Sequence, residues 1–138
     1  MLSPTKVQAA LVALLKANGL LVAGLPAADA IKEAQWRGSK FDYPAVRVDI
    51  SDMRPQGNGA CANRWLATAG SILVYSKGDS SAECENVLGL VENAIVRRHL
   101  SAAGLTSLEL RVDQVVCPFR ESNLWRGEIL FATTAIET

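Results

Sequence analysis

Two runs of strand-forming residues separated by a polar loop constrain this chain most. Residues 43–51, YPAVRVDIS, alternate apolar and polar side chains with a period of two, which predicts a strand with one buried face. Residues 65–75, WLATAGSILVY, are rich in strand formers, and their small side chains at positions 67, 69 and 70 leave room for a close neighbour. Because the two runs follow one another along the chain, we expect a long antiparallel hairpin.

A helix is predicted before this hairpin. Ser3 followed by Pro4 is typical of an N-cap and a first helical turn, and apolar residues then recur at helical spacing. Asn18–Gly19 indicates a stop, so the helix covers about residues 4–17. We also expect a short helix within residues 26–36.

The clearest helical pattern follows the hairpin, within residues 78–104. Ser80 and Glu83 fit a capping box, and an apolar stripe follows them along one side. The basic run from Arg97 to His99 falls at the C-terminal end of this segment, where cations oppose the helix dipole, and Gly104 closes it.

A second hairpin is predicted near the C-terminus. Residues 107–119, SLELRVDQVVCPF, alternate in polarity, and residues 124–136, LWRGEILFATTAI, follow after the turn RESN at 120–123. The whole length of 138 residues suits one domain. We therefore expect a single α+β domain over residues 1–138: a mostly antiparallel sheet of two hairpins, with the long helix and the N-terminal helix packed on it.

The composition excludes several classes of protein. Hydrophobic residues make up 49% of the chain, which is enough for a core and unlike a disordered protein. Lys+Arg and Asp+Glu number 14 each, so there is no overall excess of cations for nonspecific nucleic-acid binding. Three widely spaced cysteines do not suggest a secreted disulfide framework. The N-terminus lacks the basic region of a signal peptide, and no run of about 18 apolar residues predicts a membrane span, so we expect a soluble cytoplasmic protein.

The loop between the first two strands contains a weak nucleotide-binding pattern. Residues 57–62, GNGACA, match G-x-G-x-x-A. That fingerprint binds a dinucleotide only where a helix begins at the glycines, because the helix N-terminus holds the pyrophosphate. Residues 64–75 instead favour a strand, so we interpret the match as chance and expect no cofactor.

Metal binding and nucleophilic catalysis have little support. Cys61, Cys84, Cys117 and His99 would make a Cys₃His set by number, but no C-x-x-C pair is present. Cys84 falls on the apolar stripe of the long helix and Cys117 falls in a strand, so both are predicted to be small core residues. A Cys–His dyad would need a third, orienting group, and the carboxylates are scattered. We expect neither a metal site nor an enzyme.

The same loop has the composition of a binding arm. Glycine and asparagine predict mobility, and long loops either are disordered or carry binding contacts. Its many hydrogen-bonding side chains are the candidates for partner contacts: Arg54, Gln56, Asn58, Asn63 and Arg64. A plain hairpin tip with no partner is the alternative.

Several stretches, taken in order, resemble the tail-terminator proteins of long-tailed bacteriophages, the minor tail proteins of the lambdoid type. The first is Asp42 to Val46, an acid and an aromatic followed by Pro-Ala-Val at the start of a long strand. A loop and a strand opened by Trp65 follow, and then the turn and helix GDSSAECENVLGLVENAI. The last is an arginine turn and a Leu-Trp pair in FRESNLWRGEILFATTAIE.

The resemblance implies a virion protein that acts by binding. Such a subunit assembles as a ring, usually a hexamer, on the finished tail tube, ends its polymerisation and joins it to the neck of the head. The implied partners are other copies of the chain, the tail tube protein and a neck or head-completion protein, with DNA passing through the lumen without specific binding. The implied location is the tail–neck junction of a virion assembled in the host cytoplasm, with no cofactor, no metal and no membrane.

A ring needs two different complementary faces on each subunit. Charged residues on the predicted strands suit such faces, or an ordinary solvated sheet: Arg47, Asp49, Arg111, Asp113, Arg126 and Glu128. We add the turn before the last strand to the candidate contacts: Arg120, Glu121, Asn123 and Arg126. The alternatives are another head–tail connector or neck protein, and a small α+β enzyme that uses Cys61 or His99.

Overall fold

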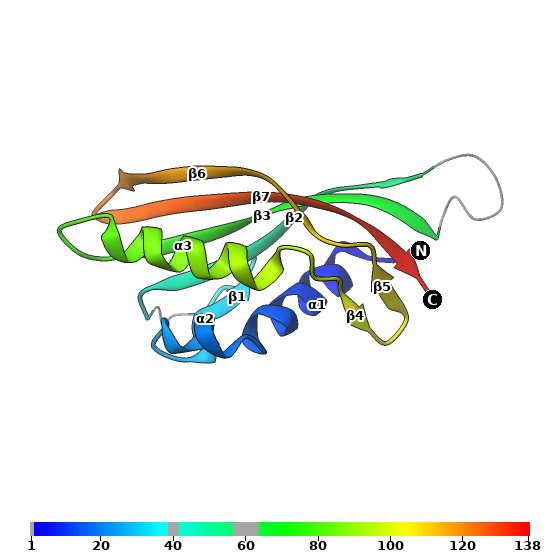
Figure 1. The fold of residues 1–138 in the computed structure, drawn as a ribbon, viewed down its shortest axis with the longest axis horizontal. Coiled ribbons are helices and arrows are strands. Elements are labelled where there is room, and N and C mark those ends of the chain that lie inside the picture. The colour runs from blue at the N-terminus through cyan, green and yellow to red at the C-terminus, as the bar shows by residue number, and fades with distance from the viewer. Residues whose placement is uncertain (1, 39–41, 57–63) are drawn as a thin grey trace.

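The structure, a computed structural model, describes residues 2–38, 42–56 and 64–138. A curled sheet forms one layer, and the helices lie together on one of its faces (Figure 1). The elements, in chain order, are α1 Pro4–Lys16, α2 Gly19–Ala23, the 3₁₀ helix η1 Ala28–Ala30, β1 Ile31–Glu33, β2 Ala45–Pro55, β3 Trp65–Ser76, α3 Ala82–Ile95, β4 Ser101–Ala102, β5 Leu105–Ser107, β6 Arg111–Glu121 and β7 Leu124–Glu137. The mixed α+β class is therefore as expected.

The sheet is larger than the four predicted strands. Seven strands run in the order β1-β2-β3-β7-β5-β4, and β6 lies beside β7 next to β5. β2 pairs with β3, β3 with β7, and β6 with β7, all antiparallel, whereas β1 pairs with β2 in parallel. The longest ladder joins β3 and β7 from Trp65 opposite Ile136 to Ser76 opposite Trp125. The other strands are paired to this central pair, either directly or through a neighbouring strand.

The first helix agrees with its sequence signals, and the segment after it does not. Ser3 is the N-cap of α1, and its hydroxyl accepts a hydrogen bond from the Lys6 amide at 3.3 Å. Asn18 follows the end of α1 but also begins α2, since its side chain accepts from the Leu21 amide at 3.0 Å. The short helix expected within 26–36 is present only as η1, and the prediction is wrong for the residues that follow it. Residues 31–33 form β1, because the apolar Ile31 is drawn into the core beside Val46.

α3 is shorter than the predicted segment. It begins after Ser81. The Ser80 hydroxyl accepts from the Ala82 amide at 3.4 Å rather than from Glu83, so the predicted Ser80–Glu83 capping box is wrong. The helix ends at Ile95. Arg97 has a φ of 60°, which is not a right-handed helical conformation. The basic run from Arg97 to His99 therefore lies beyond the last turn, and Gly104, at φ 77°, forms the turn between β4 and β5. The apolar stripe from Cys84 to Ile95 is buried as predicted.

The strand predicted over 107–119 is divided in two. β5 ends at Ser107, the chain crosses over at residues 108–110, and β6 starts at Arg111. Leu108 is consequently 50% exposed, while Leu110 is buried. The turn to β7 consists of Ser122 and Asn123, both with positive φ, which is the type I′ geometry that matches the twist of antiparallel strands.

One hydrophobic core lies between the helices and the sheet. Val7, Leu11 and Leu15 of α1 and the stripe of α3 pack against inward residues of the strands, among them Ile72 and Phe131. The opposite face of β3, β7 and β6 carries no described helix (Figure 1). The protein therefore presents an open sheet face along most of its length.

Candidate functional site

The predicted contact residues fall into two groups at opposite ends of the molecule. Arg54 lies near the end of β2, Gln56 directly follows that strand, and Arg64 precedes β3, at one end of the long axis (Figure 1). The β6–β7 turn lies at the other end. Asn58, Asn63 and Cys61 lie outside the described residues.

The turn group forms a small polar cluster around two aromatic rings. Arg126 donates to the Glu121 carboxylate at 3.2 Å and lies 5.9 Å from the centre of the Phe119 ring. Arg120 lies 5.7 Å from the centre of the Trp125 ring. Glu121, Asn123 and Arg120 are exposed. Such surface pairs contribute at most about 1 kcal/mol to stability, so they remain available to a partner.

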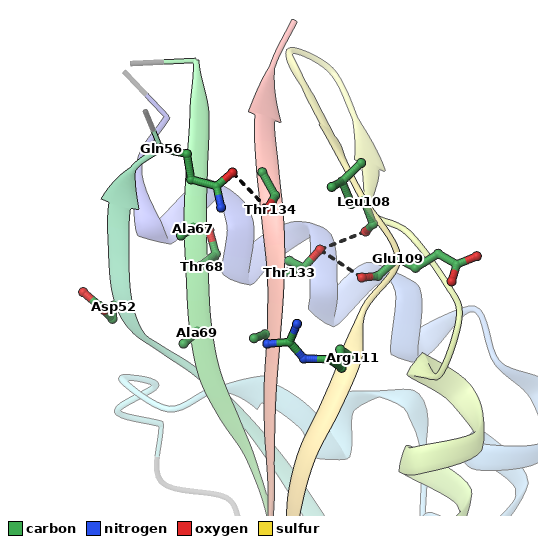
Figure 2. Close-up of a pocket in the computed structure, with 11 residues that line it drawn as sticks. Asp52, Gln56, Ala67, Thr68, Ala69, Leu108, Glu109, Arg111, Thr133 and Thr134 are labelled. Carbon is green, nitrogen blue, oxygen red and sulfur yellow. Dashed lines mark hydrogen bonds between the residues drawn. The ribbon is translucent and has the colours of Figure 1, made fainter. Parts of the chain in front are cut away.

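A groove opens on the sheet face at the other end, beside Gln56. Figure 2 shows its lining: small side chains of β3 and β7 form the floor, Asp52 and Gln56 border one side, and Glu109 and Arg111 border the other. The cavity has a volume of about 270 Å³. The small residues at 67 and 69 that predicted room for a close neighbour line it.

Hydrogen bonds hold the walls of this groove. The Thr134 hydroxyl donates to the Gln56 side chain at 3.4 Å, and the Thr133 hydroxyl donates to the carbonyl of Leu108 at 2.8 Å (Figure 2). Asp52 is paired with Arg54 at 2.8 Å, and Arg111 with Asp113 at 2.7 Å, both at the surface. The hydrogen bond and charge of Asp113 raise the pKa of Arg111. The groove therefore has a neutral floor between two charged borders.

Arg47 differs from the expectation of an outward-facing charge. It is 7% exposed, and its guanidinium donates to the carbonyls of Ala30 and Val46 at 2.8 and 2.9 Å. The Trp36 ring lies 5.3 Å from it. Burial is the main cause that lowers the pKa of Arg47. The alternation at 43–51 did not reveal this, since η1 and β1, which supply and position these contacts, were not predicted as such.

The Arg47 side chain also borders a second cavity, of about 230 Å³, which sequence reasoning missed. Aromatic side chains from three parts of the chain line it, namely Trp36, Tyr43 and Tyr75. Lys77 lies 4.8 Å from the centre of the Tyr43 ring. Tyr75 is far from Trp36 and Tyr43 in sequence, and the three show no periodicity, so no local pattern could have grouped them.

The residues considered for catalysis differ in how far their side chains are buried. Cys84 is fully buried, its thiol donates to the Val74 carbonyl at 3.6 Å, and desolvation raises the pKa of this thiol. Cys117 is exposed, so its predicted core role is wrong; β6 is an edge strand that is half-buried at most. His99 is exposed after α3.

The described residues contain neither a grouped set of metal ligands nor a membrane-spanning helix. Within residues 2–38, 42–56 and 64–138, no three His, Cys, Asp or Glu side chains are grouped to hold a metal ion. Across the same ranges no helix has the length and apolarity needed to span a bilayer.

Comparison with known proteins gives a likeness of fold. No family model matches the chain, and no curated protein matches it by sequence. Among solved structures, the chain matches a protein chain in the virion of a native gene transfer agent particle, with a TM-score of 0.76 and 18% sequence identity. The match covers 96% of this chain and 95% of the other. The two proteins share a fold over nearly their whole lengths.

Proposed function

We propose that this protein is a structural component of a phage-like virion and acts as a tail terminator. Copies of the chain form a ring, of hexameric type, that caps the tail tube, ends its polymerisation and joins it to the neck. The observation that carries the proposal is the full-length likeness of fold to a chain of a gene transfer agent virion. The order of motifs that resembles the tail-terminator family gives the more specific role.

The surface of the protein is consistent with action by binding. Its open sheet face, charged borders and exposed turn supply contacts at both ends of the molecule. Tail tube and neck lie on opposite sides of a terminator ring, so two separate groups of contact residues suit this role. DNA passes through the lumen of the ring, and the zero net charge favours passage without tight binding.

Electron microscopy of the purified protein, alone and mixed with tail tubes, tests this proposal. We expect closed rings of uniform diameter and a ring at one end of each tube. Arg64→Ala at one end of the molecule and Arg120→Ala at the other should weaken attachment to tubes or necks while rings persist. Lys16→Ala, an exposed change in α1, is the matched control. Rings that bind necks but never tube ends would favour another head–tail connector.

The enzyme alternative makes a different prediction. If Cys61 or His99 acted in catalysis, Cys61→Ala or His99→Ala would abolish the production of infectious particles although rings and tubes still assembled. We expect both variants to complement a defective phage as well as the native chain does. Loss of activity with intact assembly would overturn the structural role.

A further inference from the structure

We infer, on the basis of the ring proposed above, that neighbouring copies join by extending the sheet, with β6 of one copy beside β2 of the next. Within the described residues, part of the outer edge of each strand has no strand beside it, and Leu2 and Pro4 lie near residues 50–53 of β2. β6 pairs only with β7. β1 covers β2 only at residues 46–48, which leaves 49–55 without a strand on that side. The two edges lie at opposite sides of the β2-β3-β7-β6 part of the sheet.

The β6 edge has features of an interface strand. It is 11 residues long and carries no lysine, which is a common means of protecting an edge, although Pro118 and the two bulges of β6 also limit pairing. Val115 is 40% exposed and Phe119 is 44% exposed. Pro118 has no N–H and lies at a bulge, so pairing is expected near the N-terminal end of β6, from Arg111 to Gln114.

Strand direction allows the two edges to pair. Three antiparallel steps lead from β2 through β3 and β7 to β6, so β2 and β6 run in opposite directions. A rotation about a ring axis keeps each strand at the same angle to that axis. The β6 edge therefore meets the β2 edge of the next copy as an antiparallel neighbour, as in the ladders within the sheet.

The charges on the two edges are complementary at the same level of the sheet. A single cross-strand row runs from Asp52 through Ala69 and Ala132 to Arg111 (Figure 2). We place this row perpendicular to the ring axis, so that a rotation without rise from copy to copy brings Arg111 of one copy to Asp52 of the next. The antiparallel pair then runs from Arg111 to Gln114 along β6 and from Asp52 back to Asp49 along β2, and it stops before the residues of β2 that β1 covers.

The ion pairs that these residues make within one copy do not prevent them from pairing with the next copy instead. Asp52–Arg54 and Arg111–Asp113 are solvent-exposed and close in sequence. Exposed pairs contribute at most about 1 kcal/mol. On assembly, opposite charges across the interface set the register of the two strands and disfavour other pairings. The contact is head-to-tail, so it gives a ring where the rotation between copies closes, rather than a two-fold dimer.

Charge reversal tests this interface. Asp52→Arg and Arg111→Asp each place like charges at the contact, and each should raise the protein concentration needed for ring assembly by about tenfold or more. The double variant restores opposite charges and should return that concentration to within about threefold of the native value. Lys16→Glu is the control and should assemble normally. Assembly is measured by light scattering, and folding by circular dichroism.

Crosslinking provides a measurement that does not depend on assembly strength. With Cys61 and Cys117 replaced by serine, Asp52→Cys together with Arg111→Cys should give a ladder of oxidised oligomers up to the ring. Paired positions on adjacent antiparallel strands lie about 4.5–5.5 Å apart between Cα atoms, within disulfide reach. Lys16→Cys with Arg111→Cys should give no ladder.

The outcomes separate this interface from the proposed function. A native chain that stays monomeric at all concentrations, even with tail tubes, would overturn the ring itself. Native rings that persist in both single variants, or single-variant defects that the double variant does not repair, would overturn only the β6–β2 contact. Absence of the crosslinked ladder from intact rings would do the same.

Discussion

Two glycines in the sheet lie where an added Cβ would meet neighbouring atoms. A Cβ on Gly70 would collide with the backbone carbonyl of Asp49 and come within 2.9 Å of the Phe131 ring. A Cβ on Gly127 would instead meet the flexible end of the Leu88 side chain, which can move. Gly70 lies opposite Ile50, next to the bulge of β2, so the backbones approach closely at this point.

Gly70→Ala is expected to lower the free energy of unfolding by about 1–3 kcal/mol, since the β2 backbone must shift to admit the methyl group. Gly89→Ala is the matched control: it lies on the exposed side of α3 with open space around it. There the change should raise stability by about 0.5–1 kcal/mol, because alanine favours helix. Urea unfolding measures both. An unchanged stability for Gly70→Ala would contradict the close approach.

At the scale of elements, the ends of the helices are less predictable than their middles. The stripes of α1 and α3 follow directly from residue spacing, because a buried face repeats every three to four residues. The end of α3 depends on Arg97 adopting a positive φ, and the start of α2 depends on Asn18 acting as a cap rather than a stop. The same residue types occur at both kinds of helix end, so sequence alone does not distinguish them.

Asn18→Ala should lower the free energy of unfolding by about 1 kcal/mol, because it leaves the Leu21 amide without its capping acceptor. Asn18→Ser keeps a side-chain oxygen at the cap and should cost less. Thermal unfolding followed by circular dichroism compares the two. Equal losses would show that the cap at Asn18 does not stabilise α2.

At the scale of the whole molecule, one core couples both layers. The core cluster draws on α1, α3 and inward residues of β2, β3 and β7. The exposed features, namely the groove, the charged borders and the β6 edge, all lie on or beside the opposite face of the sheet. The core that stabilises the fold and the proposed assembly surface thus lie on opposite faces of the sheet. Variants on the open face can therefore test assembly without loss of the fold.

A single core predicts one cooperative unfolding transition. Trp36, Trp65 and Trp125 lie in different parts of the chain and report on them separately. In urea, at concentrations too low for ring assembly, tryptophan fluorescence and far-ultraviolet circular dichroism should give the same midpoint. Two separate midpoints would contradict the single domain predicted over residues 1–138.

Local patterns determined the mixed α+β class, the cap of α1, the buried stripe of α3 and the approximate positions of β2, β3 and β7. These features depend on the spacing of apolar side chains, which the chain carries in itself. The small residues of β3 also indicated room on the sheet, where the groove lies.

The features that depend on contacts between residues far apart in sequence were decided only by the tertiary structure. β1 became a strand because Ile31 packs beside Val46, and Arg47 can be buried because the carbonyl of Ala30 accepts a hydrogen bond from its guanidinium. β6 and Cys117 were left exposed because the sheet ends there. The row from Asp52 to Arg111 joins residues from four strands. Such contacts depend on how the sheet is ordered, and strand order is set by packing of the whole core rather than by any single stretch of sequence.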